Sequence, residues 1–456
     1  MRARLIVLAV TALTGALLVA PQSAGAVRGL EVALQDDRLF LHRGGVHGQY
    51  YSRDTAFDQM RAMQGSALRV NLAWSHAVVN DQERLLTKPA NVEYDWAPYW
   101  SIINLARGYG VRVQFTLTGP APSWATPTRI VERGHNRPNP RYFKEFVSAA
   151  AREFEGRVSR YSIWNEPNWI SHLAPQRQAA WRYRQLYQVG YRAIKREDPK
   201  ADVLFGELVP YDSRHAIAPL EFVRRVLCVN RRYEPTRRAV RQRDAAPLSG
   251  KRCAGGTLRA DGFAHHPYEF LKPPKKARRP SPDDVSMGAL DRLTDALDAA
   301  KESRALVPPR GEPWLPLYLT EFGYFREGDR KIPERKRAKW SVQGFRMAVE
   351  HPRVRQLLYY VFVQPPGGFS FDLSILDWQG GETRTYNALV RWATNAVSSG
   401  DVRAPRPKRD GVADRDPPPP PDGGPRPPPK DPPDENPVCE ILPVPCPDER
   451  LFDTGI

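Results

Sequence analysis

Short apolar runs alternate with longer amphipathic segments along most of the chain. The apolar runs predict strands at residues 30–34, 67–73, 111–117, 159–164, 202–205, 262–264, 317–320 and 356–363. Continuous apolar runs are typical of parallel strands, because both faces of such strands are buried. Between the runs, apolar residues recur at helical spacing. The spacing predicts helices at residues 55–63, 96–107, 141–155, 176–197, 218–226, 287–301, 335–349 and 385–396. Eight strands that alternate with helices indicate an α/β fold, the (β/α)8 or TIM barrel.

The composition changes abruptly near the end of the last predicted helix. Prolines crowd residues 401–438, interspersed with Asp, Arg and Gly. A segment of this composition cannot bury a core, so we expect a Pro-rich, extended and disordered linker there. Residues 439–456 begin with a short loop between two cysteines and are too few for a carbohydrate-binding domain. The folded domain is therefore expected over residues 27–400.

The first 26 residues are typical of an export signal. Arg2 and Arg4 give a basic start, residues 5–20 are almost wholly apolar, and residues 24–26 are small enough for a cleavage site. The apolar run is short for a lasting membrane span, and no second run of membrane length follows. We therefore expect residues 1–26 to be removed and the mature protein to be secreted, an extracellular protein without a membrane span. An uncleaved anchor is the alternative.

The four cysteines suit an oxidising compartment. They are Cys228, Cys253, Cys439 and Cys446, and none lies in a Cys-x-x-Cys pair that would indicate a zinc or redox site. Four cysteines allow three pairings. Close spacing favours Cys228–Cys253 and Cys439–Cys446, because a short loop closes at a smaller cost in entropy. The first pair would place a disulfide-bearing insertion between the fifth and sixth predicted strands.

The chain is strongly basic, with a formal net charge of +17. Basic residues concentrate in residues 224–259, 272–279 and 326–339. One interpretation is an acidic partner, such as an anionic polysaccharide or another cell-surface polymer. The other, which we favour, is an ordinary solvated surface. Nucleic acid is not an expected partner, because the chain carries an export signal and no recognisable nucleic-acid-binding motif.

Two of the predicted strands end in a glutamate. The fourth leads into Trp-Asn-Glu-Pro at residues 164–167, and the seventh leads into Thr-Glu-Phe-Gly at residues 320–323. Barrel enzymes form their active sites at the C-terminal ends of the strands, so Glu166 and Glu321 are expected to face each other there. Hydrolysis of a glycosidic bond by double displacement needs two such carboxyl groups, because one protonates the leaving oxygen while the other attacks. Either glutamate alone would as readily form a salt bridge.

Taken in order, these motifs resemble the strand signatures of clan A of the glycoside hydrolases, the retaining β-glycosidase TIM barrels. The chain is similar to families 5 and 39 of that clan, and the sequence does not choose between them. Further matching segments lie at residues 68–70, 94–96, 121–125, 266–268 and 371–382, and the resemblance covers about residues 29–396. One departure is that residues 359–364 lack the tryptophan that many clan members carry on strand 8. The floor of the sugar site is therefore expected to differ.

The resemblance implies a role for each matched residue. Glu166 would be the acid/base, protonated at the start of the reaction, and Glu321 the nucleophile. Asn165 would bond the sugar 2-hydroxyl. Arg69 would lie beside Glu321 and help to keep it ionised, since a guanidinium lowers the pKa of a neighbouring carboxyl. Tyr268 would hydrogen-bond the same carboxylate. A purely structural ion pair is the alternative for Arg69.

Other matched residues would bind substrate. His266 lies where the clan often places a His or Tyr that faces the nucleophile. Trp74, Trp124 and Trp378 are candidates for stacking on sugar rings, because pyranose C–H faces suit flat apolar surfaces. Packing within the barrel is the alternative for each tryptophan. Glu207, at the end of the fifth predicted strand, could also contact substrate.

The expected function is hydrolysis of O-glycosyl bonds in oligo- or polysaccharides, with no cofactor and no metal. His265 and His266 lack a third spaced ligand. The alternative is a glycan-binding, wall-associated barrel with little or no catalysis, in which the Pro-rich tail is the functional part. A serine hydrolase is disfavoured because the chain has no Gly-x-Ser-x-Gly. A zinc hydrolase is disfavoured because it has no His-Glu-x-x-His.

Overall fold

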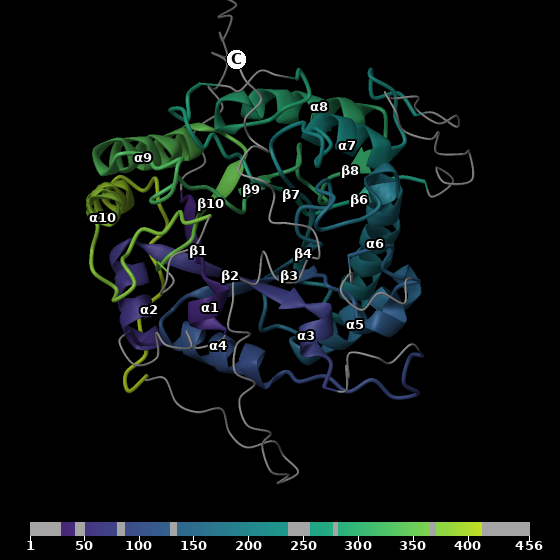
Figure 1. The fold of residues 1–456 in the computed structure, drawn as a ribbon, viewed down its shortest axis with the longest axis horizontal. Helices are drawn as coiled ribbons and strands as arrows, with labels where there is room; N and C mark the ends of the chain where they lie inside the picture. Colours follow the sequence, from purple (N-terminus) through teal and green to yellow (C-terminus); the bar gives the residue numbers. More distant parts are fainter. Residues whose placement is uncertain are drawn as a thin grey trace, which may run out of the picture.

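Eight parallel strands close into a barrel, as the sequence pattern predicts (Figure 1). The computed structural model describes residues 29–41, 51–79, 87–127, 135–235, 256–276, 281–364 and 371–412. The barrel strands are β1 (Glu31–Gln35), β2 (Gly65–Ala73), β3 (Arg112–Thr118), β4 (Arg160–Ile163), β5 (Asp202–Leu208), β7 (Gly262–His265), β9 (Leu317–Leu319) and β10 (Val354–Tyr360). Each predicted strand overlaps one of them. Two further short strands, β6 (Leu258–Arg259) and β8 (Leu306–Val307), pair with each other outside the barrel and have no counterpart in the sequence pattern.

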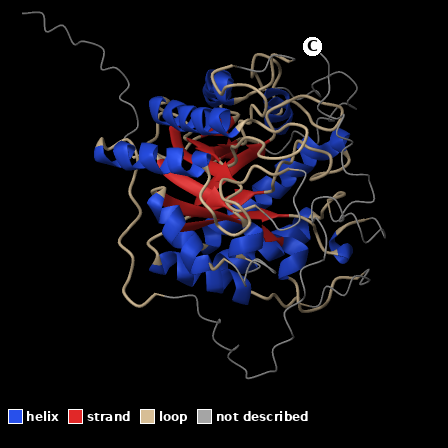
Figure 2. Ribbon diagram, turned by 60° about the vertical axis from the view of Figure 1, so that its left-hand side comes forward, coloured by secondary structure: helices blue, strands red, loops and turns tan. Residues whose placement is uncertain are grey.

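Helices surround the barrel on its outer side (Figure 2). The longer helices are α2 (Arg53–Ala62), α4 (Ala97–Gly108), α5 (Pro140–Glu153), α6 (Gln176–Glu197), α7 (Pro219–Leu227), α8 (Leu290–Glu302), α9 (Glu334–Glu350) and α10 (Arg384–Ser398), and the short ones are α1 (Asp37–Phe40) and α3 (Trp74–Ala77). In α5, Phe143, Phe146, Val147 and Ala150 share one buried stripe, as their spacing predicts. Burial of a large apolar side chain contributes about 1.5–3 kcal/mol, so this stripe fixes the helix against the barrel.

The interior of the barrel has a polar layer near the N-terminal ends of the strands. Arg160 on β4 bonds Glu31 on β1 at 2.9 Å, and Gln356 on β10 bonds the same carboxylate at 2.9 Å. β1 and β4 are not neighbours in the sheet, so their side chains can meet only inside the barrel. Burial raises the pKa of Glu31, but the positive charges of Arg160 and Arg112 outweigh it and lower the pKa overall. Above this layer the interior is apolar, with Ala33, Ala67, Leu204, Ala264 and Leu358.

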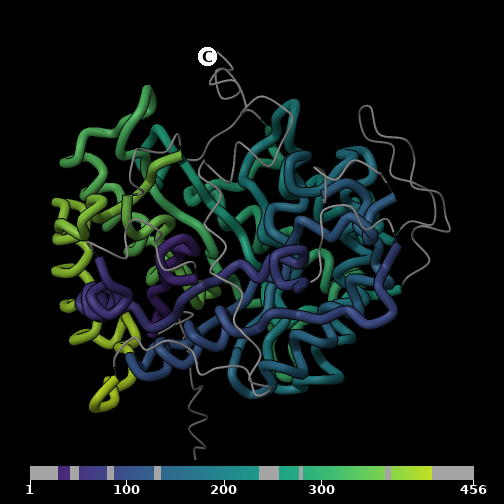
Figure 3. The backbone as a smooth tube through the Cα atoms, turned by 60° about the horizontal axis from the view of Figure 1, so that its bottom comes forward, coloured from purple at the N-terminus to yellow at the C-terminus, as the bar shows by residue number. Residues whose placement is uncertain are grey.

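The first residues of the predicted linker lie against the barrel. We call residues 401–412 the C-terminal clasp. Its backbone pairs with Leu30, which accepts from Arg403 N at 2.9 Å, and with Gly110, which accepts from Arg406 N at 3.2 Å. Gly110 has φ +72°, and a Cβ there would lie 2.1 Å from the carbonyl oxygen of Arg406. A glycine is therefore needed for this approach. The clasp runs beside α2 (Figures 1 and 3), to which Lys408 is ion-paired through Asp58.

Several sequence-based expectations lie outside the described residues. These include the export signal, most of the Pro-rich linker and both predicted disulfides, because Cys228 is the only cysteine in the described ranges. Among the helices that the structure describes, none combines the length and apolar character that crossing a membrane requires. The predicted boundary after residue 400 coincides with the end of α10. The clasp continues past it because backbone groups at the edge of the barrel accept hydrogen bonds from the chain there.

Candidate active site

The glutamate after β4 is held by an uncommon backbone conformation. Trp164 has φ +66° and Glu166 has φ +43°, a left-handed region that costs a non-glycine residue about 1–3 kcal/mol. Surrounding contacts hold this geometry in place. The buried Trp164 donates from Nε1 to the carbonyl oxygen of His172 at 2.7 Å. Asn168 donates to the carbonyl oxygen of Val209 at 3.1 Å, which ties the loop after β4 to the end of β5.

The second glutamate follows β9 directly. Thr320 N donates to the carbonyl oxygen of His265 at 2.9 Å, so the strand pairing continues up to Glu321. Gly323 then passes close to β10, where a Cβ would lie 2.5 Å from the carbonyl oxygen of Tyr360. The glycine allows the chain to turn away from the barrel immediately after the glutamate. Glu321 is thus fixed at the C-terminal end of the barrel.

The structure brings the two glutamates together, as their places at strand ends suggested. A carboxylate oxygen of Glu166, one of Glu321 and a ring nitrogen of His266 all lie within 4.8 Å of one another. His266 Nδ1 is 2.8 Å from Glu166 Oε1 and 3.6 Å from Glu321 Oε2. Each glutamate is 7% exposed and His266 is fully buried. The imidazole therefore stands between two carboxyl groups that are largely shielded from water.

Two donors hold Glu321. The buried Arg69 donates from Nη1 to Oε1 at 2.9 Å, and the hydroxyl of Tyr268 donates to Oε2 at 2.9 Å. Both contacts are those that the resemblance implied. Burial raises the pKa of Glu321, the positive charges of His266 and Arg69 lower it, and the negative charge of Glu166 raises it again. The net direction is upward. Arg69 does not outweigh burial, and it also binds a further carboxylate.

That further carboxylate is Glu207, which is 1% exposed. Arg69 Nη2 lies 2.5 Å from Glu207 Oε2, and Arg69 Nε donates to Oε1 at 3.3 Å, so the guanidinium grips this carboxylate with two nitrogens. Arg69 also donates to Asn165 Oδ1 at 2.8 Å and to Gln35 Oε1. Only one of its hydrogen bonds reaches Glu321. Arg69 is therefore the hub that fixes Glu207, Asn165 and Glu321 relative to one another.

Glu207 points into the site because β5 bulges before it. The pairing of β5 with β7 shifts register between Gly206 and Leu208. Gly206 has φ +120°, and a Cβ there would lie 2.3 Å from the carbonyl oxygen of Ala264. Glu207 itself has φ +54°. A bulge re-aims the side chain that follows it, and here it turns a carboxylate toward Arg69.

Glu166 is held by two imidazoles. Besides His266, His172 Nδ1 lies 3.2 Å from Glu166 Oε2. Burial opposes ionisation of Glu166, but hydrogen bonds from His172 and His266 lower its pKa to about 2. Burial lowers the pKa of His266, yet the charges of Glu321 and Glu166 raise it overall. The lowered pKa of Glu166 and the raised pKa of His266 both favour the shared proton on the imidazole. That Glu166 is protonated at the start of the reaction stays a prediction.

The same three residues also form a set that could hold a divalent cation. Two carboxylates and one imidazole are common ligands for such ions. Arg69 and Tyr268, however, each donate to Glu321 at 2.9 Å. A cation bound there would lie beside the Arg69 guanidinium and compete with both donors for the carboxylate oxygens. The described residues fit a proton-sharing pair better than a metal centre.

Solved structures of glycoside hydrolases share the fold of this chain. The chain matches a family 39 glycoside hydrolase from Bacteroides cellulosilyticus WH2 with a TM-score of 0.54 and 16% identity, over 80% of this chain and 64% of that one. It matches the GH39 enzyme from Xanthomonas axonopodis pv. citri with a TM-score of 0.50 and 16% identity, over 79% of this chain and 65% of that one. The chain has the same barrel fold as these two proteins.

This likeness shows the barrel fold and leaves the choice between families 5 and 39 open. The chain spans less than two thirds of the length of either family 39 protein. No family model and no curated protein matches the sequence. Within this barrel, Glu166 and Glu321 follow the fourth and seventh strands, β4 and β9.

The tryptophans predicted as sugar platforms lie in different surroundings. Trp74 is fully buried and stacks on Phe146 at 5.6 Å between ring centroids, so the structure does not support a stacking role for it. Trp124 is 6% exposed and meets Trp74 edge-on at 5.9 Å. Both rings belong to the apolar core, where Trp74 contacts Phe143 and Phe146 of α5 and Trp124 contacts Tyr142 of the same helix. Trp378 is 39% exposed and remains a candidate platform.

Aromatic side chains form a wall beside the glutamates. Tyr268 stacks on Phe270 at 4.6 Å between centroids, and Phe371 meets Phe270 edge-on at 5.6 Å. Tyr360 ends β10, and burial together with the charge of Glu321 raises its pKa well above the ordinary value. It lies in the segment that lacks the expected tryptophan. Tyr360 therefore occupies the place on strand 8 where the resemblance led us to expect a different floor.

Proposed function

We propose that the protein is a retaining glycoside hydrolase that cleaves β-glycosidic bonds in oligo- or polysaccharides, with Glu321 as nucleophile and Glu166 as acid/base. The approach of the two carboxylates carries the proposal, because an oxygen of each lies within 4.8 Å of the other. Retaining enzymes hold their carboxyl groups about 5–5.5 Å apart, whereas inverting enzymes leave about 6.5–9.5 Å for a water. We also propose that the enzyme acts outside the cell, as residues 1–26 suggest.

The site geometry supplies a route for each step. Arg69 and Tyr268 orient the carboxylate of Glu321, which attacks the anomeric carbon and forms a glycosyl-enzyme ester. The proton on His266 Nδ1 passes over 2.8 Å to Glu166 Oε1 and from there to the leaving oxygen, so the aglycone departs as an alcohol. Glu166, then ionised, removes a proton from water as the water attacks the ester. This second step frees Glu321, and the captured proton returns to the Glu166–His266 pair.

The pH dependence follows from these protonation states. Glu321 must be ionised, so activity falls on the acidic side as pH drops through its pKa, which burial raises. The Glu166–His266 pair must hold one proton, so activity falls on the alkaline side as pH rises through the pKa of that pair. The charges of Glu321 and Glu166 raise the pKa of His266 and move that limb upward. The profile is therefore a bell whose limbs belong to the coupled groups.

The test is the stereochemistry of the first-formed sugar. After a panel of aryl β-glycosides has identified a substrate, proton NMR recorded during early turnover is expected to show the β-anomer appearing before mutarotation. An α-anomer from the unmodified enzyme would contradict double displacement. Glycan binding without turnover on the whole panel would favour the alternative of a glycan-binding barrel.

Glu207→Gln tests the hub at Arg69. Glutamine can still accept from Arg69 Nη2, so we expect kcat/KM at the optimum to fall by less than about tenfold. The lost negative charge leaves Arg69 less neutralised, so the pKa of Glu321 falls and the acidic limb of the kcat/KM profile moves to lower pH. Glu312→Gln, at an exposed position, is the control and should leave the profile in place. A lower melting temperature with an unmoved limb would mean that Glu207 is structural only.

A further inference from the structure

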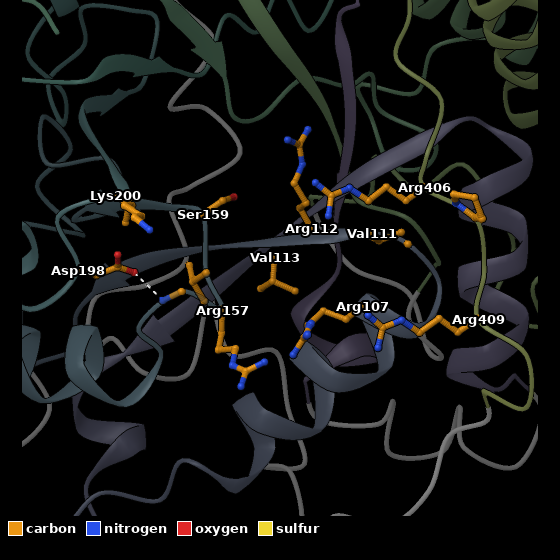
Figure 4. A pocket seen from close by; sticks show the side chains of 15 residues that line it. Arg107, Val111, Arg112, Val113, Arg157, Ser159, Asp198, Lys200, Arg406 and Arg409 are labelled. Atoms are coloured by element: carbon orange, nitrogen blue, oxygen red, sulfur yellow. Dashed lines mark hydrogen bonds between the residues drawn. The ribbon is translucent and has the colours of Figure 1, made fainter. Parts of the chain in front are cut away.

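A cavity of about 480 Å³ opens at the end of the barrel opposite the glutamates (Figure 4). Its walls come from the end of α4, the start of β3 and the turns that precede β4 and β5, and from the clasp. We call it the floor pocket. It lies at the N-terminal ends of the strands, so nothing in the proposed hydrolysis uses it.

Six of the fifteen residues that line the floor pocket are basic, and one is acidic. Asp198 is the only acidic side chain among the residues that line the cavity, and it accepts a hydrogen bond from Gly156 N at 3.0 Å. The basic residues that line it are Arg107, Arg112, Arg157, Lys200, Arg406 and Arg409. Figure 4 shows Arg406 near Arg112 and Arg409 near Arg107. Basic side chains from several segments of the chain therefore meet around the floor pocket.

Most of these cations have no side-chain partner among the residues that the structure describes. Arg112 is ion-paired with Glu31. The side chains of the other five form no ion pair or hydrogen bond with any residue that the structure describes. Arg107 also lies close enough to Arg157 and Arg409 for their charges, after burial, to lower its pKa. Like charges held this near one another repel, which an anion between them would relieve.

The clasp holds two of the arginines in place. Arg406 N donates to the carbonyl oxygen of Gly110 at 3.2 Å, and Arg409 N donates to that of Gly108 at 2.8 Å. The close approach at Gly110 needs a residue without a Cβ. The backbone is thus built to bring cationic side chains toward other cations. An ordinary solvated surface needs no such arrangement.

Two arginines from the basic segments of the sequence, Arg224 and Arg337, differ from these cations because each forms an ion pair. Arg224 lies 2.5 Å from Asp283, and Arg337 lies 2.8 Å from Glu334. Both arginines are buried, and their charges are already neutralised within the fold. These two arginines therefore serve structure, whereas five basic side chains of the floor pocket have no ion-pair partner among the described residues.

We propose that the floor pocket binds a segment of a polyanionic glycan through phosphate or sulfate esters. Arginine suits tetrahedral oxyanions because its fork of N–H groups can bond two oxygens at once. The cavity falls within the range of about 300–1,000 Å³ that small-ligand sites occupy. A ligand there would anchor the protein to an anionic polymer while the opposite end of the barrel faces its substrate. The proposal does not depend on hydrolysis.

Calorimetric titration of the full chain tests the pocket. The probes are inorganic tripolyphosphate, a sulfated hexasaccharide and a hexasaccharide of uronic acids, each at about 50 and 200 mM salt. The variant Arg157→Ser/Arg406→Ser/Arg409→Ser removes three exposed cations of the pocket. The matched control, Arg335→Ser/Lys336→Ser/Lys339→Ser, removes three exposed cations from α9. We expect the pocket variant to bind the phosphate or sulfate probe at least about tenfold more weakly and the control to change by less than about twofold.

A second variant tests whether weaker binding results from detachment of the clasp rather than from loss of charge. Arg157→Ser/Lys200→Ser changes only the turns before β4 and β5, and it should weaken binding while the melting temperature stays the same. If tripolyphosphate binds more tightly than the sulfated hexasaccharide, the natural glycan is expected to carry phosphate esters. The reverse order would indicate sulfate esters. Equal weakening in the pocket variant and the α9 control would overturn the proposal, because diffuse charge would explain it. Absence of binding by the unmodified chain, or preference for the uronic acid probe, would also overturn it.

Discussion

Glu321→Ala is expected to lower kcat/KM by about 10⁴-fold or more for every glycoside substrate. The substitution removes the attacking group itself, so activated and unactivated leaving groups should suffer alike. The fold should survive, because the barrel strands are held by backbone pairing and alanine leaves β9 unchanged. Initial rates on an aryl β-glycoside and on a natural oligosaccharide provide the measurement.

Azide distinguishes loss of the nucleophile from loss of the fold. The small anion can occupy the space that Glu321 leaves and attack the anomeric carbon from the same side. The expected product is a glycosyl azide of inverted configuration, detectable by proton NMR. Glu382→Ala, at an exposed position, is the control and should keep full activity. Substantial hydrolysis by Glu321→Ala without azide would remove Glu321 from the site.

Glu166→Ala should separate substrates by their leaving groups. A nitrophenolate departs without protonation, so formation of the glycosyl-enzyme should fall by less than about tenfold for a dinitrophenyl glycoside. An alkyl or sugar leaving group needs the proton, and its kcat/KM should fall by about 10²–10⁴-fold. The measurement is the slope of log(kcat/KM) against the pKa of the leaving group, which should become steeply negative in the variant.

The unmodified enzyme is the reference for this slope, which should be shallow when proton transfer accompanies bond cleavage. Azide should accelerate Glu166→Ala with a dinitrophenyl substrate, because it replaces the water that Glu166 activates. The product here should be a β-glycosyl azide, opposite in configuration to that from Glu321→Ala. Equal losses for all leaving groups would show that Glu166 does not protonate the aglycone.

The sequence predicts the barrel well because its strands are buried on both faces. Every predicted strand overlaps an observed one, and α6 spans the predicted residues 176–197. The sequence pattern did not predict β6 and β8, because strands of two residues carry no periodic signal. The sequence pattern also did not predict that the ordered chain continues into the clasp. The clasp contacts the barrel through backbone groups, which no side-chain pattern reveals.

The candidate site is predictable only where a strand end marks it. Glu166 and Glu321 both follow apolar runs, and the family resemblance adds Arg69. His172 lies in a loop whose path depends on tertiary contacts, so its spacing carries no signal. Glu207 does end a strand, but its contact with Arg69 depends on the bulge at the preceding residue, a feature of sheet pairing. The sequence left sugar stacking and barrel packing open for Trp74, because a motif does not show which way a ring packs.

Closure of the barrel has a consequence for how the chain reaches this structure. Pairing of β1 with β10 joins Glu31 to Gln356, and the clasp then joins Leu30 to Arg403. A growing polypeptide cannot form either junction until most of it has been synthesised. Until then the sheet stays open, with unpaired edges that invite association with other chains. Contacts between such distant residues also form slowly, so we expect a late, slow closing phase during which chaperones would protect the open sheet.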